Sequence, residues 1–214
     1  MTTTTTTTTS LRRNRIGSKN ADLYSWEPLP YEKIESNYAT QEYIQDKIRK
    51  DILDIDAILE PPESQDIGLW QYEHVRQFTL ELNQYAVLLK DVCNSQTCPQ
   101  MKATDDWLFL CAAHAKQQTQ DCCAIDYIVH MLDSTATLLN SDKHFPKRSI
   151  EISQESLKQL QSTVRRLYRL FAHAFFHHRE LYDEIETNTL ICKRFTQFAT
   201  KYKLISNNQL IING

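Results

Sequence analysis

The fold of this chain is decided by the stretch Val164-Arg-Arg-Leu-Tyr-Arg-Leu-Phe-Ala-His-Ala-Phe-Phe-His-His178. In an α-helix each residue turns by about 100°, so the large apolar side chains of this region and its flanks fall within an arc of roughly 80°. These side chains belong to Leu157, Leu160, Val164, Leu167, Phe171, Phe175 and Tyr182. The pattern predicts one central helix that buries a single face, takes Ser153 as its N-cap and continues to about Glu186.

Three arginines lie on the side of this helix that faces away from the apolar arc. Arg165, Arg166 and Arg169 fall at about 0°, 100° and 40° on the helical wheel, whereas the apolar arc is centred at about 240°. Between Glu155 and the histidines, no acidic residue lies on this face of the helix, so the arginines have no ion-pair partner on their own helix. Such a row of cations is either a solvated helix face or a binding site for an anion, and the pattern leaves both readings open.

Composition limits the size and the chemistry of the protein. The chain has 214 residues, of which 41% are hydrophobic and 10% aromatic, which is enough for one domain with a sizeable core. The net charge is −3, so no overall positive field attracts nucleic acid, and any basic binding site must be local. Gly17, Gly68 and Gly214 are isolated from one another. They cannot form a Walker loop or a dinucleotide-binding loop, which argues against a nucleotide-dependent enzyme.

The first 36 residues differ from the rest of the chain. They combine the threonine tract Thr2 to Thr9 with a basic patch and two prolines, which predicts a disordered arm, 1–36, before a folded domain, 37–214. The chain shows no apolar signal-peptide core and no later apolar run that is long enough to span a bilayer. We therefore expect a cytoplasmic protein without direct membrane insertion. Its six cysteines are expected to be thiols or metal ligands rather than a disulfide framework.

The remainder of the domain is predicted to be mainly α-helical. Apolar residues recur at three- and four-residue steps in the regions 40–59, 70–89 and 124–139 and around Phe195, Phe198 and Tyr202. Trp107 to Ala113 is a short apolar run that fits either a strand or a buried helix, and the polar stretch Lys116 to Asp121 suits the tip of a hairpin. We expect an irregular helical bundle around the central helix, with one small β-hairpin.

Two cysteines and the histidines of the central helix carry the clearest chemical signal. Cys93 and Cys98 flank a polar turn. Two thiolates from a turn and two imidazoles from a helix make the Cys₂His₂ set that zinc prefers in closed structural sites. The alternative is that the cysteines are small buried hydrophobes and the histidines a polar helix end. On a straight helix His173 and His177 lie about 40° apart, whereas His173 and His178 lie about 140° apart, so geometry alone favours His177 as the fourth ligand.

A zinc hydrolase is the less favoured reading of the same residues. The helical motif H-E-x-x-H would need a glutamate at position 174, where this chain has Ala174. Four protein ligands would also leave no open position for a catalytic water.

Several stretches together resemble the Mob family, and its phocein branch fits best. These stretches are Cys93-x₄-Cys98, the Val164–His178 helix, Leu59-Glu-Pro-Pro-Glu-Ser-Gln-Asp-Ile-Gly-Leu-Trp70 and Trp107-Leu-Phe-Leu-Cys-Ala-Ala-His114. The resemblance covers almost everything after the threonine tract and implies a non-catalytic kinase adaptor with a zinc-stabilised helical core. The ligand pattern of the family, C-x₄-C and H-x₄-H, falls on Cys93, Cys98, His173 and His178. It therefore implies His178 rather than His177, which stays the fallback.

The resemblance also implies a binding site for a phosphothreonine peptide. The basic cluster that binds phosphopeptides in the family falls on Arg165, Arg166 and Arg169, and guanidinium groups suit a dianionic phosphate. Mob proteins that activate nuclear Dbf-two-related kinases have acidic residues just before a tryptophan that matches Trp70. The matching positions here are Gln65 and Leu69, which puts direct activation of those kinases in doubt.

The phocein branch implies particular partners. They are a striatin-type scaffold, protein phosphatase 2A and germinal-centre (Ste20-like) kinases, which together form the striatin-interacting phosphatase and kinase assembly. An alternative reading from the same resemblance is an adaptor in membrane traffic at Golgi or endocytic membranes. Because nothing in the sequence anchors the chain to lipid, that location would depend on a partner.

Overall fold

The computed structural model describes residues 13–34, 38–63, 65–114, 122–146 and 152–212. The chain divides into two compact units, Met1–Glu35 and Ser36–Gly214. In the first unit, short 3₁₀ turns span Asn20–Asp22 and Tyr31–Lys33, and the rings of Tyr24 and Trp26 contact each other edge to face. The threonine tract lies outside the described residues.

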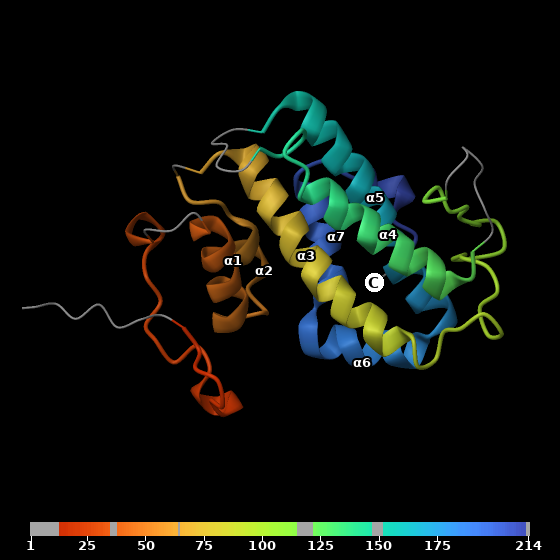
Figure 1. Ribbon diagram of the computed structural model, residues 1–214, viewed down its shortest axis with the longest axis horizontal. Coiled ribbons are helices and arrows are strands. Elements are labelled where there is room, and N and C mark those ends of the chain that lie inside the picture. The colour runs from red at the N-terminus through yellow and green to blue at the C-terminus, as the bar shows by residue number, and fades with distance from the viewer. Residues whose placement is uncertain (1–12, 35–37, 64, 115–121, 147–151, 213–214) are drawn as a thin grey trace, which may run out of the picture. The chain divides into compact units, whose positions relative to one another are not determined.

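Seven α-helices form the described part of the second unit, and no strand occurs there (Figure 1). They are α1 (Ala39–Lys50), α2 (Ile55–Leu59), α3 (Ile67–Leu89), α4 (Ala124–Leu139), α5 (Gln154–His177), α6 (Arg179–Thr189) and α7 (Ile191–Lys201). The prediction of a mainly helical domain is therefore confirmed. None of these helices is both long enough and apolar enough to cross a lipid bilayer.

Two helices organise the bundle. α3 packs against α1, α4, α5 and α7, and α5 packs against α3, α4, α6 and α7. Between them the rings of Phe78, Phe171, Phe195 and Phe198 meet at centroid distances of 5.1–5.4 Å. Because α5 has neighbours on several sides, its buried surface is wider than the predicted arc and also includes Leu170 and Ala172.

Side-chain hydrogen bonds cap the first turns of α3 and α5. Ser153 caps α5 as predicted, since its hydroxyl accepts a hydrogen bond of 3.1 Å from the Ser156 amide. Asp66 caps α3 by accepting from the Leu69 amide at 2.7 Å. This cap explains why α3 begins at Ile67, three residues before the first residue of the predicted region.

Two helices that the sequence predicts as continuous are interrupted. The region 40–59 separates into α1 and α2, because the Asp51 side chain accepts from the Leu53 amide and Asp54 then caps α2. Local hydrogen bonds of aspartate side chains compete with the helical pattern. The predicted continuation of the central helix to Glu186 is also wrong. Its backbone leaves the helical conformation at His178, with φ −138° and ψ 52°, and α6 begins at the next residue.

The predicted β-hairpin is not found in the described residues. One isolated antiparallel bridge joins Lys102 to Leu108, and the Phe109 amide donates to the Met101 carbonyl at 2.8 Å. These contacts close a loop but extend no ladder. Trp107, Leu108 and Leu110 are each at least 40% exposed, whereas Phe109 and Cys111 pack against the core. The proposed tip, Lys116 to Asp121, lies outside the described residues.

A buried histidine in α3 makes the stability of the domain depend on pH. His74 is 1% exposed and lies between the rings of Trp70 and Phe198, at 4.6 and 5.2 Å. Burial, with smaller contributions from Arg194 and Lys201, lowers the pKa of His74 to about 3. The unfolded chain takes up a proton at this side chain near pH 6.5, while the folded chain does not, so stability falls as the pH drops below about 6.5.

We predict that His74 alone accounts for a loss of about 2 kcal/mol between pH 7 and pH 5, from 1.36 kcal/mol per pH unit over about 1.5 units. The test compares urea unfolding of the wild type and of His74→Gln at both pH values. Other acid-sensitive groups affect both proteins equally, so the difference between them isolates His74. An equal loss in both proteins would show that this side chain does not carry the effect.

Candidate metal centre and arginine pocket

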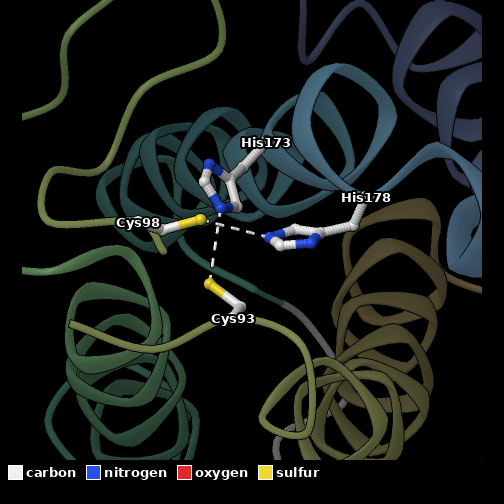
Figure 2. A group of neighbouring side chains, drawn as sticks. All are labelled: Cys93, Cys98, His173 and His178. Atoms are coloured by element: carbon white, nitrogen blue, oxygen red, sulfur yellow. Dashed lines mark hydrogen bonds between the residues drawn. The ribbon is translucent and has the colours of Figure 1, made fainter. Parts of the chain in front are cut away.

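Two cysteines from a turn and two histidines from helix ends meet at one point (Figure 2). Cys93 and Cys98 lie just after α3, His173 is in the last turn but one of α5, and His178 is the junction between α5 and α6. Asn94 shapes the turn that carries the cysteines. Its side-chain oxygen accepts from the amides of Gln96 and Thr97, and its carbonyl accepts from the Cys98 amide.

The spacing of the four donor atoms matches a tetrahedral metal site. The Cys93 Sγ lies 3.5 Å from the His173 Nε2, and the Cys98 Sγ lies 3.3 Å from the His178 Nε2. All four donor atoms lie within 4.8 Å of one another. Bonds of about 2.0–2.3 Å from zinc to nitrogen and sulfur require separations of roughly 3.3–3.8 Å between ligand atoms. The residues present therefore fit a zinc ion with little rearrangement.

The structure brings His178 into this cluster and leaves His177 outside it. The His177 ring stacks on His173 with a centroid distance of 4.8 Å and is exposed to solvent. The straight-helix geometry that favours His177 assumes that the helix continues, but the backbone turns at His178. This turn directs the His178 ring toward Cys98, where Figure 2 shows it pointing at the two sulfur atoms.

A backbone carbonyl fixes the orientation of His173. The His173 Nδ1 lies 2.7 Å from the carbonyl oxygen of Lys102. Since a carbonyl only accepts, the Nδ1 carries the proton and the Nε2 presents its lone pair to the cluster. Metal-binding histidines are commonly held in this way by a second hydrogen bond. No sequence pattern indicates this contact, because Lys102 is far from His173 along the chain.

Burial favours the neutral forms of Cys93, His173 and His178. It raises the pKa of the Cys93 thiol, against a backbone hydrogen bond from Ile125 that acts in the opposite direction. It lowers the pKa of His173 to about 4 and also lowers the pKa of His178. Neutral imidazoles are ready to bind a metal at pH 7, whereas the thiols must first release a proton. Metal binding at this cluster should therefore weaken in acid.

The three arginines of the central helix do not form one cluster. Arg165 is exposed, and its Nε donates to the carbonyl of Leu204 at 3.3 Å. Arg166 and Arg169 instead line a pocket of about 100 Å³ between α4, α5 and residues 110–113. The predicted set thus separates into one arginine that contacts the C-terminal segment and two that share a pocket.

The pocket leaves one charged donor without a partner. The Nε of Arg166 is buried and has no hydrogen-bond acceptor among the described residues. Arg169 is held in place, since it donates to the Tyr127 hydroxyl and lies 4.7 Å from the centroid of the Phe109 ring. The pocket is therefore lined by two cationic side chains, of which Arg169 is already held in position. Helical spacing predicts that Arg166 and Arg169 lie near each other, but nothing in the sequence pairs Tyr127 or Phe109 with them.

The two positions before Trp70 that match acidic residues of Mob proteins, Gln65 and Leu69, carry no charge. Gln65 is 8% exposed and accepts a hydrogen bond of 3.0 Å from the Thr40 hydroxyl. Leu69 is half-buried. This surface therefore offers no carboxylate at either position to a basic partner.

Comparison with known proteins identifies a family and several similar proteins. The model of the Mob1/phocein family matches residues 46–212. The chain is 50% identical over 202 residues to "MOB kinase activator-like 4" of Drosophila melanogaster, and the aligned region covers 94% of this chain and 89% of that protein. It is 50% identical over 203 residues to "MOB-like protein phocein" of Caenorhabditis elegans, with coverage of 95% and 90%. Identity to "DBF2 kinase activator protein MOB1" of Saccharomyces cerevisiae is 26% over 149 residues, with coverage of 67% and 48%. The chain belongs to the Mob1/phocein family.

Proposed function

We propose that this protein is a non-catalytic adaptor that recognises a phosphothreonine segment of a kinase or scaffold in the cytoplasm. The observation that carries the proposal is the pocket that Arg166 and Arg169 line together, with the buried Nε of Arg166 lacking an acceptor among the described residues. A phosphate group offers three acceptor oxygens and about two negative charges, which match two guanidinium groups. Family membership supports the adaptor role, since two of the three relatives named above carry the term kinase activator in their names.

The metal centre has a structural role in this proposal. Cys93, Cys98, His173 and His178 would hold a zinc ion that ties the turn after α3 to the end of α5. Four protein ligands leave no coordination position for a substrate or a water, as is usual for structural zinc. The arrangement therefore favours an adaptor over a zinc hydrolase.

The proposed partners are a striatin-type scaffold, protein phosphatase 2A and germinal-centre (Ste20-like) kinases. The 50% identity to a phocein protein supports the choice of this branch. The neutral pair Gln65 and Leu69 supports it as well, because a basic kinase segment that pairs with carboxylates would find none at these positions. In this proposal the chain joins the kinase to the scaffold through two different surfaces.

The test is a binding assay with purified components. The immobilised chain is expected to retain a striatin-type scaffold whatever its state of phosphorylation, and to retain a Ste20-like kinase only when the kinase is phosphorylated on threonine. Arg166→Ala should abolish kinase retention and leave scaffold retention intact. Retention of the kinase after complete phosphatase treatment would contradict a phosphothreonine reader, and failure to retain the scaffold would contradict the assignment of that partner.

A further inference from the structure

A second group of two cysteines and two histidines lies outside the metal centre described above. It consists of Cys111, His114, Cys122 and His130. Cys111 and His114 follow the loop that the Lys102–Leu108 bridge closes, Cys122 lies two residues before α4, and His130 lies within α4. The two groups share no residue.

The donor atoms of this group converge as those of the first group do. The Cys111 Sγ lies 3.6 Å from the His130 Nδ1, and the Cys122 Sγ lies 3.8 Å from the same nitrogen and 2.9 Å from the His114 Nε2. All four donor atoms lie within 4.8 Å of one another. Two of these distances fall in the range of roughly 3.3–3.8 Å between ligands of a tetrahedral zinc ion, and the third needs to lengthen by about half an ångström.

The rings and sulfur atoms of this group face one another. The rings of His114 and His130 meet edge to face with a centroid distance of 5.0 Å, which leaves their nitrogens directed at the sulfurs. His114, Cys122 and His130 are only half-buried, while Cys111 is 3% exposed. Cysteines that serve only as small hydrophobes need no imidazole beside each sulfur. A neighbouring cysteine, Cys123, is equally half-buried but takes no part in the group.

We propose that Cys111, His114, Cys122 and His130 form a second structural zinc site. Two sulfur and two nitrogen donors in a tetrahedral arrangement select zinc among the common divalent ions. On binding, each of the two thiols releases one proton, so the two thiolates balance the two positive charges of the ion. Four protein ligands close the coordination sphere and leave no position for a substrate.

The site would fix one wall of the arginine pocket. Cys111 lines that pocket together with Arg166 and Arg169, and His130 lies in the helix that supplies Tyr127. A zinc ion between Cys111 and His130 would join residues 111–114 to α4. The chain that follows α3 would then be held at two points, first by Cys93 and Cys98 and later by Cys111 and His114.

The test counts zinc in the tag-free full chain after dialysis against a weak chelator. Elemental analysis should give two zinc ions per wild-type chain, one per Cys111→Ser/Cys122→Ser chain and two per Cys123→Ser chain, the matched control. Circular dichroism would establish that the double variant keeps its helices. One ion per wild-type chain, with the same content in the double variant, would overturn the second site. The first site is judged separately, since its loss would reduce the content of Cys93→Ser and not that of the control.

Cobalt substitution gives a second measurement that does not depend on how well the variant folds. When Co²⁺ is added to the metal-free wild type, the thiolate-to-cobalt absorption should rise in proportion to the added Co²⁺ up to two equivalents per chain. The visible absorption bands of tetrahedral Co²⁺ should be present over the whole titration. Saturation of this absorption at one equivalent would contradict the proposal. So would a thiol titration of freshly prepared protein that shows Cys111 and Cys122 joined in a disulfide, because a disulfide offers no thiolate ligands.

Discussion

Replacing Cys93 by serine is expected to release one zinc ion per chain and to lower the melting temperature by about 10 °C. Cys93 is fully buried, and its sulfur faces His173 at 3.5 Å. A serine hydroxyl is a poor zinc ligand, so the binding free energy of the ion no longer stabilises the fold. A loss of about 4 kcal/mol corresponds to roughly 8–16 °C for a domain of 150–250 residues. Elemental analysis and scanning calorimetry on the same preparation give both values.

The matched control is Cys123→Ser, which changes a cysteine that belongs to neither group of ligands. It should keep the zinc content and the melting temperature of the wild type. If Cys93→Ser retained all of its zinc, the assignment of this centre would be wrong, however large the change in stability. Loss of zinc without a change in melting temperature would show that the ion does not hold the fold together.

Replacing Arg166 and Arg169 together by alanine is expected to weaken binding of a phosphothreonine peptide about a thousandfold, which corresponds to roughly 4 kcal/mol. Charge-assisted hydrogen bonds contribute about 1.5–3 kcal/mol each, and both arginines line the same pocket. Arg165→Ala should change the affinity less than threefold, because its guanidinium donates to the Leu204 carbonyl instead. Fluorescence anisotropy with a labelled peptide measures all three proteins.

A charge-preserving variant separates shape from charge at this pocket. Arg166→Lys keeps the positive charge but loses the planar fork that binds two oxygens at once, so an intermediate affinity is expected. Since Arg169 also contacts Tyr127 and Phe109, the melting temperature of each variant must be compared with that of the wild type. If Arg165→Ala weakened binding as much as the double variant, the phosphate would lie on the exposed helix face and not in the pocket.

Local periodicity predicted the helices that carry the site. The regions 70–89 and 124–139 correspond to α3 and α4, and the Ser153 cap is where the sequence placed it. These features depend on side chains a few residues apart, which a single sequence contains. The interruptions at Asp51 and His178 were missed because a helical pattern continues through both, and local or tertiary contacts decide the backbone there.

Contacts between distant segments limited the prediction of the site. The fourth member of the metal centre, His178, followed from the ligand pattern of the family and not from helix geometry, which assumed a straight helix. The arginine stripe was predicted as a unit, but the acceptor of Arg165 is in the C-terminal segment and the neighbours of Arg169 come from α4 and residue 109. Likewise, Cys111, His114 and Cys122 are close in sequence, yet only the fold brings His130 to them.

The proposed adaptor function depends most on the binding of phosphothreonine in the pocket lined by Arg166 and Arg169. The direct test is calorimetric titration of the folded, zinc-loaded chain with a phosphothreonine peptide from a germinal-centre kinase, beside its unphosphorylated twin. We predict binding of the phosphorylated peptide with a stoichiometry of one, and no measurable heat from the twin at the same concentrations. Equal affinity for both peptides, or no binding of either, would contradict the central claim and leave Arg166 and Arg169 without the proposed ligand.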